Sequence, residues 1–175
     1  MLRRVWLIQI RENKQLTQKQ VAERAFIDRS YYAQIETGER NPSLEVSKEI
    51  ARALGFHYSI FEQGTNPFYY ALNQAPFILA QCDVDLRYTW IFNPHCDFQT
   101  YEVIGKTDRE IHDNPGTQAL QQLKQDVLEA KIPMNRVITF PLSNGNISYQ
   151  VFAHPLFDDS LTLVGAATAS SEITK

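Results

Sequence analysis

A short polar stretch near the N-terminus carries side chains that could recognise DNA base pairs. The set consists of Arg29, Ser30, Tyr31 and Gln34. Such a set can donate hydrogen bonds to guanine, pair with adenine or contact a thymine methyl group. If these side chains share one exposed face of a helix, they form a recognition surface for the major groove.

Three further polar residues flank this stretch and are candidates for phosphate contacts. Gln18 lies at the expected start of the preceding helix, and Arg40 and Asn41 follow the polar stretch. Contacts to phosphate fix the position of a protein on the duplex without selecting a sequence. Gln18, Arg40 and Asn41 are therefore expected to position the recognition residues.

Charge is unevenly distributed along the chain, whose net charge is −3. Residues 1–65 carry 10 basic and 8 acidic side chains, and residues 66–175 carry 7 and 12, which suggests two modules with different partners. Asp28, Glu36 and Glu39 are expected to weaken the positive field beside the polar stretch. Because phosphate attraction is then modest, we expect tight binding to need a homodimer on two half-sites.

Helix signals surround the polar stretch, and the pattern stays helical to about residue 61. Thr17 followed by Gln20 forms a capping-box pattern, which predicts the start of one helix. Asp28 is an N-cap candidate for the next helix, and Gly38 can end it in a left-handed conformation. An apolar stripe at spacing i, i+4, i+5 and i+8 within residues 46–54 predicts another helix.

Apolar residues recur at the spacing that a helix-turn-helix needs for its buried positions. These are Val21, Ala22, Ala25, Ile27, Tyr32 and Ile35. Ala22 matters most, because a small residue there lets the two helices cross closely. Residues 16–25 (Leu-Thr-Gln-Lys-Gln-Val-Ala-Glu-Arg-Ala), with the related motifs at 29–44 and 50–56, closely resemble the lambda-repressor-like, or Xre-type, helix-turn-helix family. The resemblance covers about residues 3–61 and implies a five-helix domain at 1–61 that binds a double-stranded DNA operator.

Phe26 departs from the family pattern, which usually has glycine in the turn. A left-handed conformation at a phenylalanine would cost about 1 kcal/mol. We expect either a locally different turn or packing of Phe26 that offsets the strain.

After turn-forming residues at 64–67, which mark a linker at 62–73, the pattern changes to short strands. The expected strands are 77–82, 88–92, 137–140, 147–152 and 161–166, with a helix at 117–131 and a hairpin turn at 143–146. This order predicts an α+β domain at 74–175, a five-stranded antiparallel sheet with helices on one face.

The second half resembles a PAS domain, on the strength of residues 78–95, the Val-Ile-Gly-Lys-Thr-Asp motif at 103–108, and residues 163–170. The stretch at 87–95 is most similar to PAS domains attached to bacterial sensor kinases. The resemblance implies a pocket between sheet and helices, or a dimer surface on the sheet. Five aromatic side chains could line a ligand pocket or simply form core: Trp90, Phe92, Phe140, Tyr149 and Phe152.

Cofactor chemistry has few candidates, and we expect neither a resident cofactor nor a metal. Cys96 lacks the surroundings of a light-sensing flavin domain. Haem could be ligated by His95, His112, His154 or Cys96, but the helix at 117–131 has no histidine. Zinc needs about four ligands, and only His95 and Cys96 are adjacent.

Composition excludes several classes of protein. With 43% hydrophobic and 21% charged residues the chain is ordinary globular protein. No stretch reaches the roughly 18 apolar residues of a membrane helix. The apolar start meets Arg11 and Glu12 too early for a signal peptide, so a cytoplasmic location is expected. Glycine-rich phosphate loops, nucleophile elbows and His-Glu-x-x-His motifs are missing, so we expect no catalytic residues.

These patterns together predict a one-component transcription regulator. Its N-terminal domain would bind an operator, and its PAS-like domain would dimerise and could hold a small ligand. No ATP-binding segment precedes Lys175, so a signal would pass back through residues 62–73. Two alternatives stay open: an interaction module whose PAS-like half binds a partner protein, and a haem-bearing or redox-sensing regulator.

Overall fold

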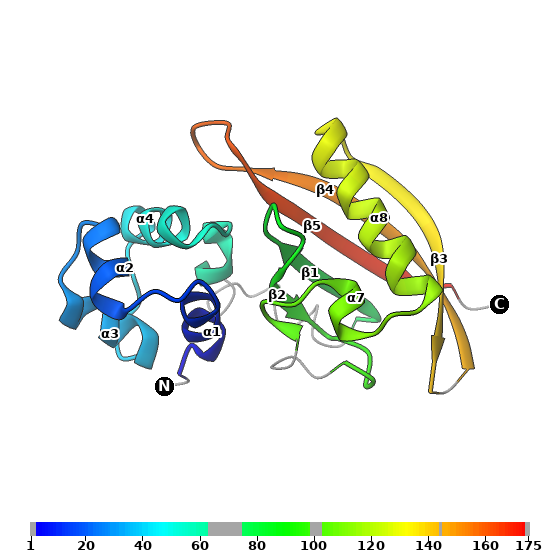
Figure 1. Ribbon diagram of the computed structural model, residues 1–175, viewed down its shortest axis with the longest axis horizontal. Coiled ribbons are helices and arrows are strands. Elements are labelled where there is room, and N and C mark those ends of the chain that lie inside the picture. Colours follow the sequence, from blue (N-terminus) through cyan, green and yellow to red (C-terminus); the bar gives the residue numbers. More distant parts are fainter. Residues whose placement is uncertain (1–2, 63–74, 99–102, 144, 174–175) are drawn as a thin grey trace. The chain divides into compact units, whose positions relative to one another are not determined.

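The computed structural model describes residues 3–62, 75–98, 103–143 and 145–173 (Figure 1). The chain divides into two compact units, residues 1–66 and 67–175. The linker expected at 62–73 falls almost wholly outside the described residues, so its boundaries remain a prediction. None of the helices in the described ranges has the length and apolar character needed to cross a bilayer.

The N-terminal unit is helical. It contains α1 (Val5–Asn13), α2 (Gln18–Arg24), α3 (Arg29–Thr37), α4 (Leu44–Leu54) and the 3-10 helix η1 (Tyr58–Glu62). Thr17 and Gln20 form the expected capping box, with the Thr17 amide donating to Gln20 Oε1 over 2.8 Å. Gly38 ends α3 in a left-handed conformation, as predicted. Asp28 precedes α3, but its side chain makes no capping hydrogen bond.

Apolar side chains from these helices form the N-terminal core. Five of the six positions expected to be buried are buried: Val21, Ala22, Ala25, Tyr32 and Ile35. The sixth, Ile27, is half-buried in the turn. The helices therefore pack as the spacing predicts, with Ala22 at 1% exposure where α2 approaches its neighbours.

The C-terminal unit is one antiparallel sheet with helices on one face (Figure 1). Its elements are β1 (Phe77–Cys82), β2 (Tyr88–Phe92), α7 (Asp108–Ile111), α8 (Pro115–Ala130), β3 (Met134–Leu142), β4 (Gly145–Phe157) and β5 (Leu163–Glu172). The strand order is β2-β1-β5-β4-β3, which confirms the predicted class. Strand β5 runs beyond the expected residue 166 because it pairs with both β1 and β4.

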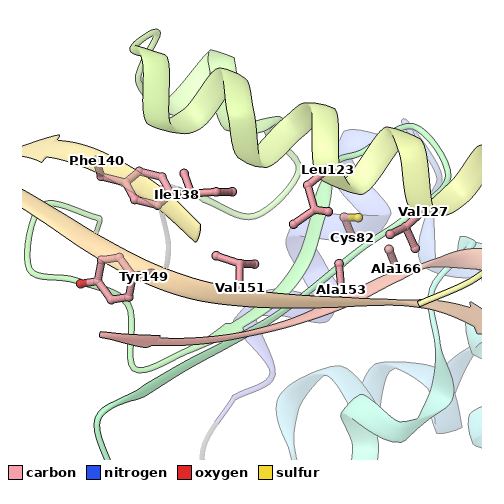
Figure 2. Close-up of a cluster of buried hydrophobic side chains, with 9 residues drawn as sticks. All are labelled: Cys82, Leu123, Val127, Ile138, Phe140, Tyr149, Val151, Ala153 and Ala166. Atoms are coloured by element: carbon pink, nitrogen blue, oxygen red, sulfur yellow. The ribbon is translucent and has the colours of Figure 1, made fainter. Parts of the chain in front are cut away.

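Helix α8 covers the sheet and closes the main core of this unit. Figure 2 shows Leu123 and Val127 pointing from α8 toward Val151 and Ala153 on β4. At the start of α8, a Cβ on Gly116 would lie 2.6 Å from the Phe140 ring and 2.8 Å from the Thr139 carbonyl oxygen. Only glycine permits this close approach of helix to strand.

Candidate DNA interface and interior cavity

The four candidate base-contacting residues lie on the side of α3 away from the core. Arg29 and Ser30 are exposed in its first turn, and Tyr31 and Gln34 are half-buried. The opposite side of α3 is fully buried through Tyr32, Ile35 and Glu36. A single helix therefore combines a packed face with a polar face that begins at its N-terminus, where recognition helices contact bases.

Arg40 is brought beside this helix by the turn that follows Gly38. Its guanidinium lies 5.8 Å from the centre of the Tyr31 ring, within the range of a cation–π contact. Its peptide N–H donates to the Gln34 carbonyl over 3.1 Å. The exposed guanidinium thus flanks the polar face of α3.

Asn41 is held by a residue that the sequence analysis did not identify. Its Oδ1 accepts a hydrogen bond from the guanidinium of Arg4, which also donates to the carbonyls of Ile35 (2.6 Å) and Arg40 (3.0 Å). Burial lowers the pKa of Arg4 from its usual value. Since Arg4 and Asn41 are 37 positions apart, local spacing could not reveal this contact.

Glu36 is the centre of a buried polar network. Its carboxylate accepts from Arg11 Nε over 2.6 Å and from Gln18 Nε2 over 2.8 Å, and its side chain is 2% exposed. Glu36 therefore lies inside the domain, where Arg11 compensates its charge, and its expected weakening of the positive field beside the polar stretch stays a prediction. Gln18 lies at the start of α2 as expected, with its amide oriented by Glu36.

Phe26 contradicts both expectations for the turn. Its φ is 54°, so the left-handed conformation is retained, and its side chain is 86% exposed. The turn therefore carries a backbone cost of roughly 1–2 kcal/mol that packing does not offset.

A cavity of about 60 Å³ lies inside the C-terminal unit, between the sheet and helices α7 and α8. Of the five aromatic candidates, Phe140 and Tyr149 line it, with ring centres 5.8 Å apart and an angle of 78° between the rings. The hydroxyl-bearing residues Thr168 and Ser170 of β5 line it too. This wall combines apolar surface with a few polar groups, which is typical of ligand pockets.

The other three aromatic candidates do not line this cavity. Trp90 and Phe92 stack on each other with centres 6.0 Å apart, and Phe152 is exposed on β4. A register shift between Gln81 and Cys82 makes Tyr88, rather than Trp90, face the helices. Beyond this shift Trp90 pairs with Gln81 and Phe92 with Leu79, so both lie on the face opposite Tyr88, because directly paired residues of neighbouring strands share a face.

Three buried polar residues, which the sequence analysis also missed, form a network beside the cavity, and two of them, Tyr88 and Asp108, line it. Lys124 Nζ lies 2.9 and 3.0 Å from the two carboxylate oxygens of Asp108, and Tyr88 Oη donates to Asp108 Oδ1 over 2.6 Å. Burial, together with Asp108, raises the pKa of Tyr88 well above its usual value. The sequence did indicate that Lys124 is buried, because Lys124 lies four residues after Leu120 and three before Val127, on the apolar face of α8.

The loop after β2 brings together three potential metal ligands rather than the two expected. One ligand atom each of His95, Cys96 and Asp97 lies within 4.8 Å of the other two. Ser143 donates to the Asp97 carboxylate from its hydroxyl (2.6 Å) and its amide (2.8 Å), which lowers the pKa of Asp97. In the part of the chain that the structure describes, the set is one short of the about four ligands of structural zinc.

Comparison with known proteins agrees with this architecture. The helix-turn-helix family model matches residues 7–61, and the PAS fold model matches residues 72–175. YqaF, an uncharacterized HTH-type transcriptional regulator of Bacillus subtilis, is 50% identical over 58 residues, which cover 33% of this chain and 76% of YqaF.

The chain is also similar to parts of larger proteins. Histidine kinase 5 of Arabidopsis thaliana is 27% identical over 134 residues, which make up 76% of this chain but only 13% of the kinase. A VqmA dimer structure from Vibrio cholerae aligns with a TM-score of 0.53 at 16% identity, covering 60% of this chain and 49% of VqmA, and shows likeness of fold alone. The chain belongs to the lambda-repressor-like helix-turn-helix family through residues 7–61 and to the PAS fold family through residues 72–175.

Proposed function

We propose that this protein is a sequence-specific DNA-binding transcription regulator with no catalytic activity of its own. The observation that carries the proposal is the polar face of α3, which presents Arg29, Ser30 and Gln34 beside the Arg40 guanidinium. The family of the N-terminal domain, which includes phage and bacterial regulators, supports it.

Fluorescence anisotropy on an operator selected from a random DNA pool tests the separate roles. Gln34→Ala or Arg29→Ala should lose about 1–3 kcal/mol of discrimination at single base pairs. Arg40→Ala should weaken binding to all sequences and lower the salt slope by about 1. Arg52→Ala, which removes an exposed guanidinium from α4, is the control. Equal losses on operator and random DNA for Gln34→Ala would disprove its role in base recognition.

The C-terminal domain is proposed to make the protein a homodimer through the sheet face away from the helices. Phe77, Val137 and Phe152 are exposed there, and the strand register places them on the same side. Phe152→Glu should give a monomer in native mass spectrometry, whereas Lys131→Glu on the exposed end of α8 should not. A Phe152→Glu protein that stays dimeric would rule this face out.

The cavity is proposed to hold a small molecule that shifts the dimer between arrangements with different half-site spacing. Such a ligand acts only through its different affinities for the two arrangements. VqmA, which has a similar fold, is a dimer with a target DNA and has been solved bound to the compound DPO, and this likeness supports the proposal. Native and denaturing mass spectrometry of the same sample would reveal a bound compound as mass lost on denaturation.

A further inference from the structure

The cavity wall includes a charge that is cancelled within the protein. Asp108 lines the cavity, and its carboxylate is paired with the ammonium of Lys124. Lys124 is 1% exposed and Asp108 2%, so water does not screen either charge. The two charges sum to zero at the cavity wall.

The carboxylate of Asp108 can accept a further hydrogen bond. Lys124 is fully engaged, since its ammonium contacts both carboxylate oxygens and lies 3.7 Å from the centre of the Tyr88 ring. Asp108 Oδ1 receives Tyr88 and Lys124, whereas Oδ2 receives Lys124 alone. A carboxylate offers about four lone-pair sites, so Oδ2 can accept one more hydrogen bond.

Both the charge and the volume restrict what can enter. A charged guest would bury a charge without a partner, because Asp108 and Lys124 already neutralise each other, and such burial is costly. His95 is the other histidine, lysine, arginine or carboxylate residue of the described cavity wall. The cavity of about 60 Å³ is well below the roughly 150 Å³ that holds benzene in an engineered cavity.

We propose that the cavity selects a small uncharged compound with an apolar part and an N–H or O–H group that donates to Asp108. Lys124 is the specificity-determining residue, because it cancels the charge of the accepting carboxylate. Thr168 and Ser170 supply hydroxyls for an acceptor on the same compound. This inference rests on the proposed ligand-holding role of the C-terminal domain.

Three probes of the same shape and different charge test the inference: acetamide, acetamidinium and acetate. Each is titrated into the full-length ¹⁵N-labelled protein, and the amide shifts of cavity residues give the affinity. The wild type should bind acetamide at least about tenfold more tightly than either ion, a factor equal to about 1.4 kcal/mol. Equal binding of an ion, or no acetamide binding in the cavity, would overturn the proposal.

Variants that remove one charge of the Asp108–Lys124 pair provide a second test. Lys124→Met leaves Asp108 uncompensated and should make acetamidinium the preferred probe, whereas Asp108→Asn leaves Lys124 uncompensated and should favour acetate. The double variant should prefer acetamide again, and Lys131→Met, on the surface at the end of α8, should behave as the wild type. If the folded single variants prefer the same probe as the wild type, the role of Lys124 is overturned. If neither single variant folds, the order of the three probe affinities in the wild type decides the question.

DNA binding of the same samples separates this inference from the proposed function. Operator affinity measured by anisotropy should persist in any folded variant whose probe preference changes. If the wild type does not bind the operator, the proposed DNA-binding role is wrong. If it binds the operator but does not prefer acetamide over the two ions, only the inference about the cavity is wrong.

Discussion

Both halves of the molecule contain an ion pair with little exposure to water, but the surroundings of the two pairs differ. In the N-terminal domain Arg11 Nε lies 2.6 Å from Glu36 Oε1, with Arg11 12% exposed. In the C-terminal domain Lys124 lies 2.9 Å from Asp108 Oδ2, and neither is accessible to water. Gln18 completes the first pair within packed helices, whereas the second borders a cavity.

The different surroundings indicate that a buried ion pair can have two roles, one in positioning helices and one in selecting a ligand. Burying an ion pair costs desolvation energy in both domains and contributes little net stability. The Arg11–Glu36 pair fixes α1 and α3 and orients Gln18 at the start of α2. The Lys124–Asp108 pair joins α8 to α7, and Asp108 lines the cavity. We therefore expect the first to affect stability and DNA geometry, and the second to affect stability and ligand choice.

The largest effect is expected when the fully buried pair loses one partner. Asp108→Ala should lower the free energy of unfolding of the C-terminal domain by about 3–5 kcal/mol, because Lys124 is left charged and unpaired. Urea denaturation measures this, with Trp90 fluorescence followed in a Trp6→Phe background. The pair-removing variant Asp108→Leu with Lys124→Met should recover most of the loss; if it does not, the pair contributes net stability.

A smaller loss is expected for the N-terminal pair. Glu36→Ala should lower the free energy of unfolding of that domain by about 2–3 kcal/mol, since the partly exposed Arg11 can regain water. Trp6 fluorescence in a Trp90→Phe background reports on this domain alone. An equal shift of Trp90 fluorescence, measured for Glu36→Ala in the Trp6→Phe background, would show that the two domains unfold together and would contradict the comparison.

Relief of the strained turn should produce a gain rather than a loss. Phe26→Gly removes the penalty of a left-handed phenylalanine, whose exposed ring contributes no packing, so the N-terminal domain should gain about 1 kcal/mol. Thermal unfolding followed at Trp6 measures it. Phe26→Ala keeps the backbone penalty and serves as the control, so an equal gain there would refute the strain argument.

The smallest effect is expected from chemical labelling of the two cysteines, which tests whether the interior of the C-terminal domain is accessible to solvent. Burial raises the pKa of Cys82 to about 11, whereas Cys96 is exposed. Because the thiolate is the reactive form, iodoacetamide should modify Cys96 in the native protein and Cys82 only in urea. Mass spectrometry of wild type and Cys96→Ser checks this. Native labelling of Cys82 would mean that the interior opens, and the contrast between the two ion pairs would weaken.

Prediction from sequence succeeded where the interactions are local. The Thr17–Gln20 capping box and the left-handed Gly38 depend on neighbours a few positions away, and the strand at 77–82 is marked by its own apolar run. The prediction of pocket-lining aromatic residues was only partly right. Phe140 and Tyr149 line the cavity, but the bulge beside Cys82 places Trp90 and Phe92 on the other face of the sheet.

The sequence by itself determined the two families, the class of each domain and the polar face of α3, because periodicity and caps are written in adjacent residues. Only the tertiary structure decided that Arg4 holds Asn41, that Arg11 neutralises Glu36, and that Lys124 meets Asp108 at a cavity. Those contacts join side chains 16 to 37 positions apart, whose distances are fixed by packing and not by spacing along the chain.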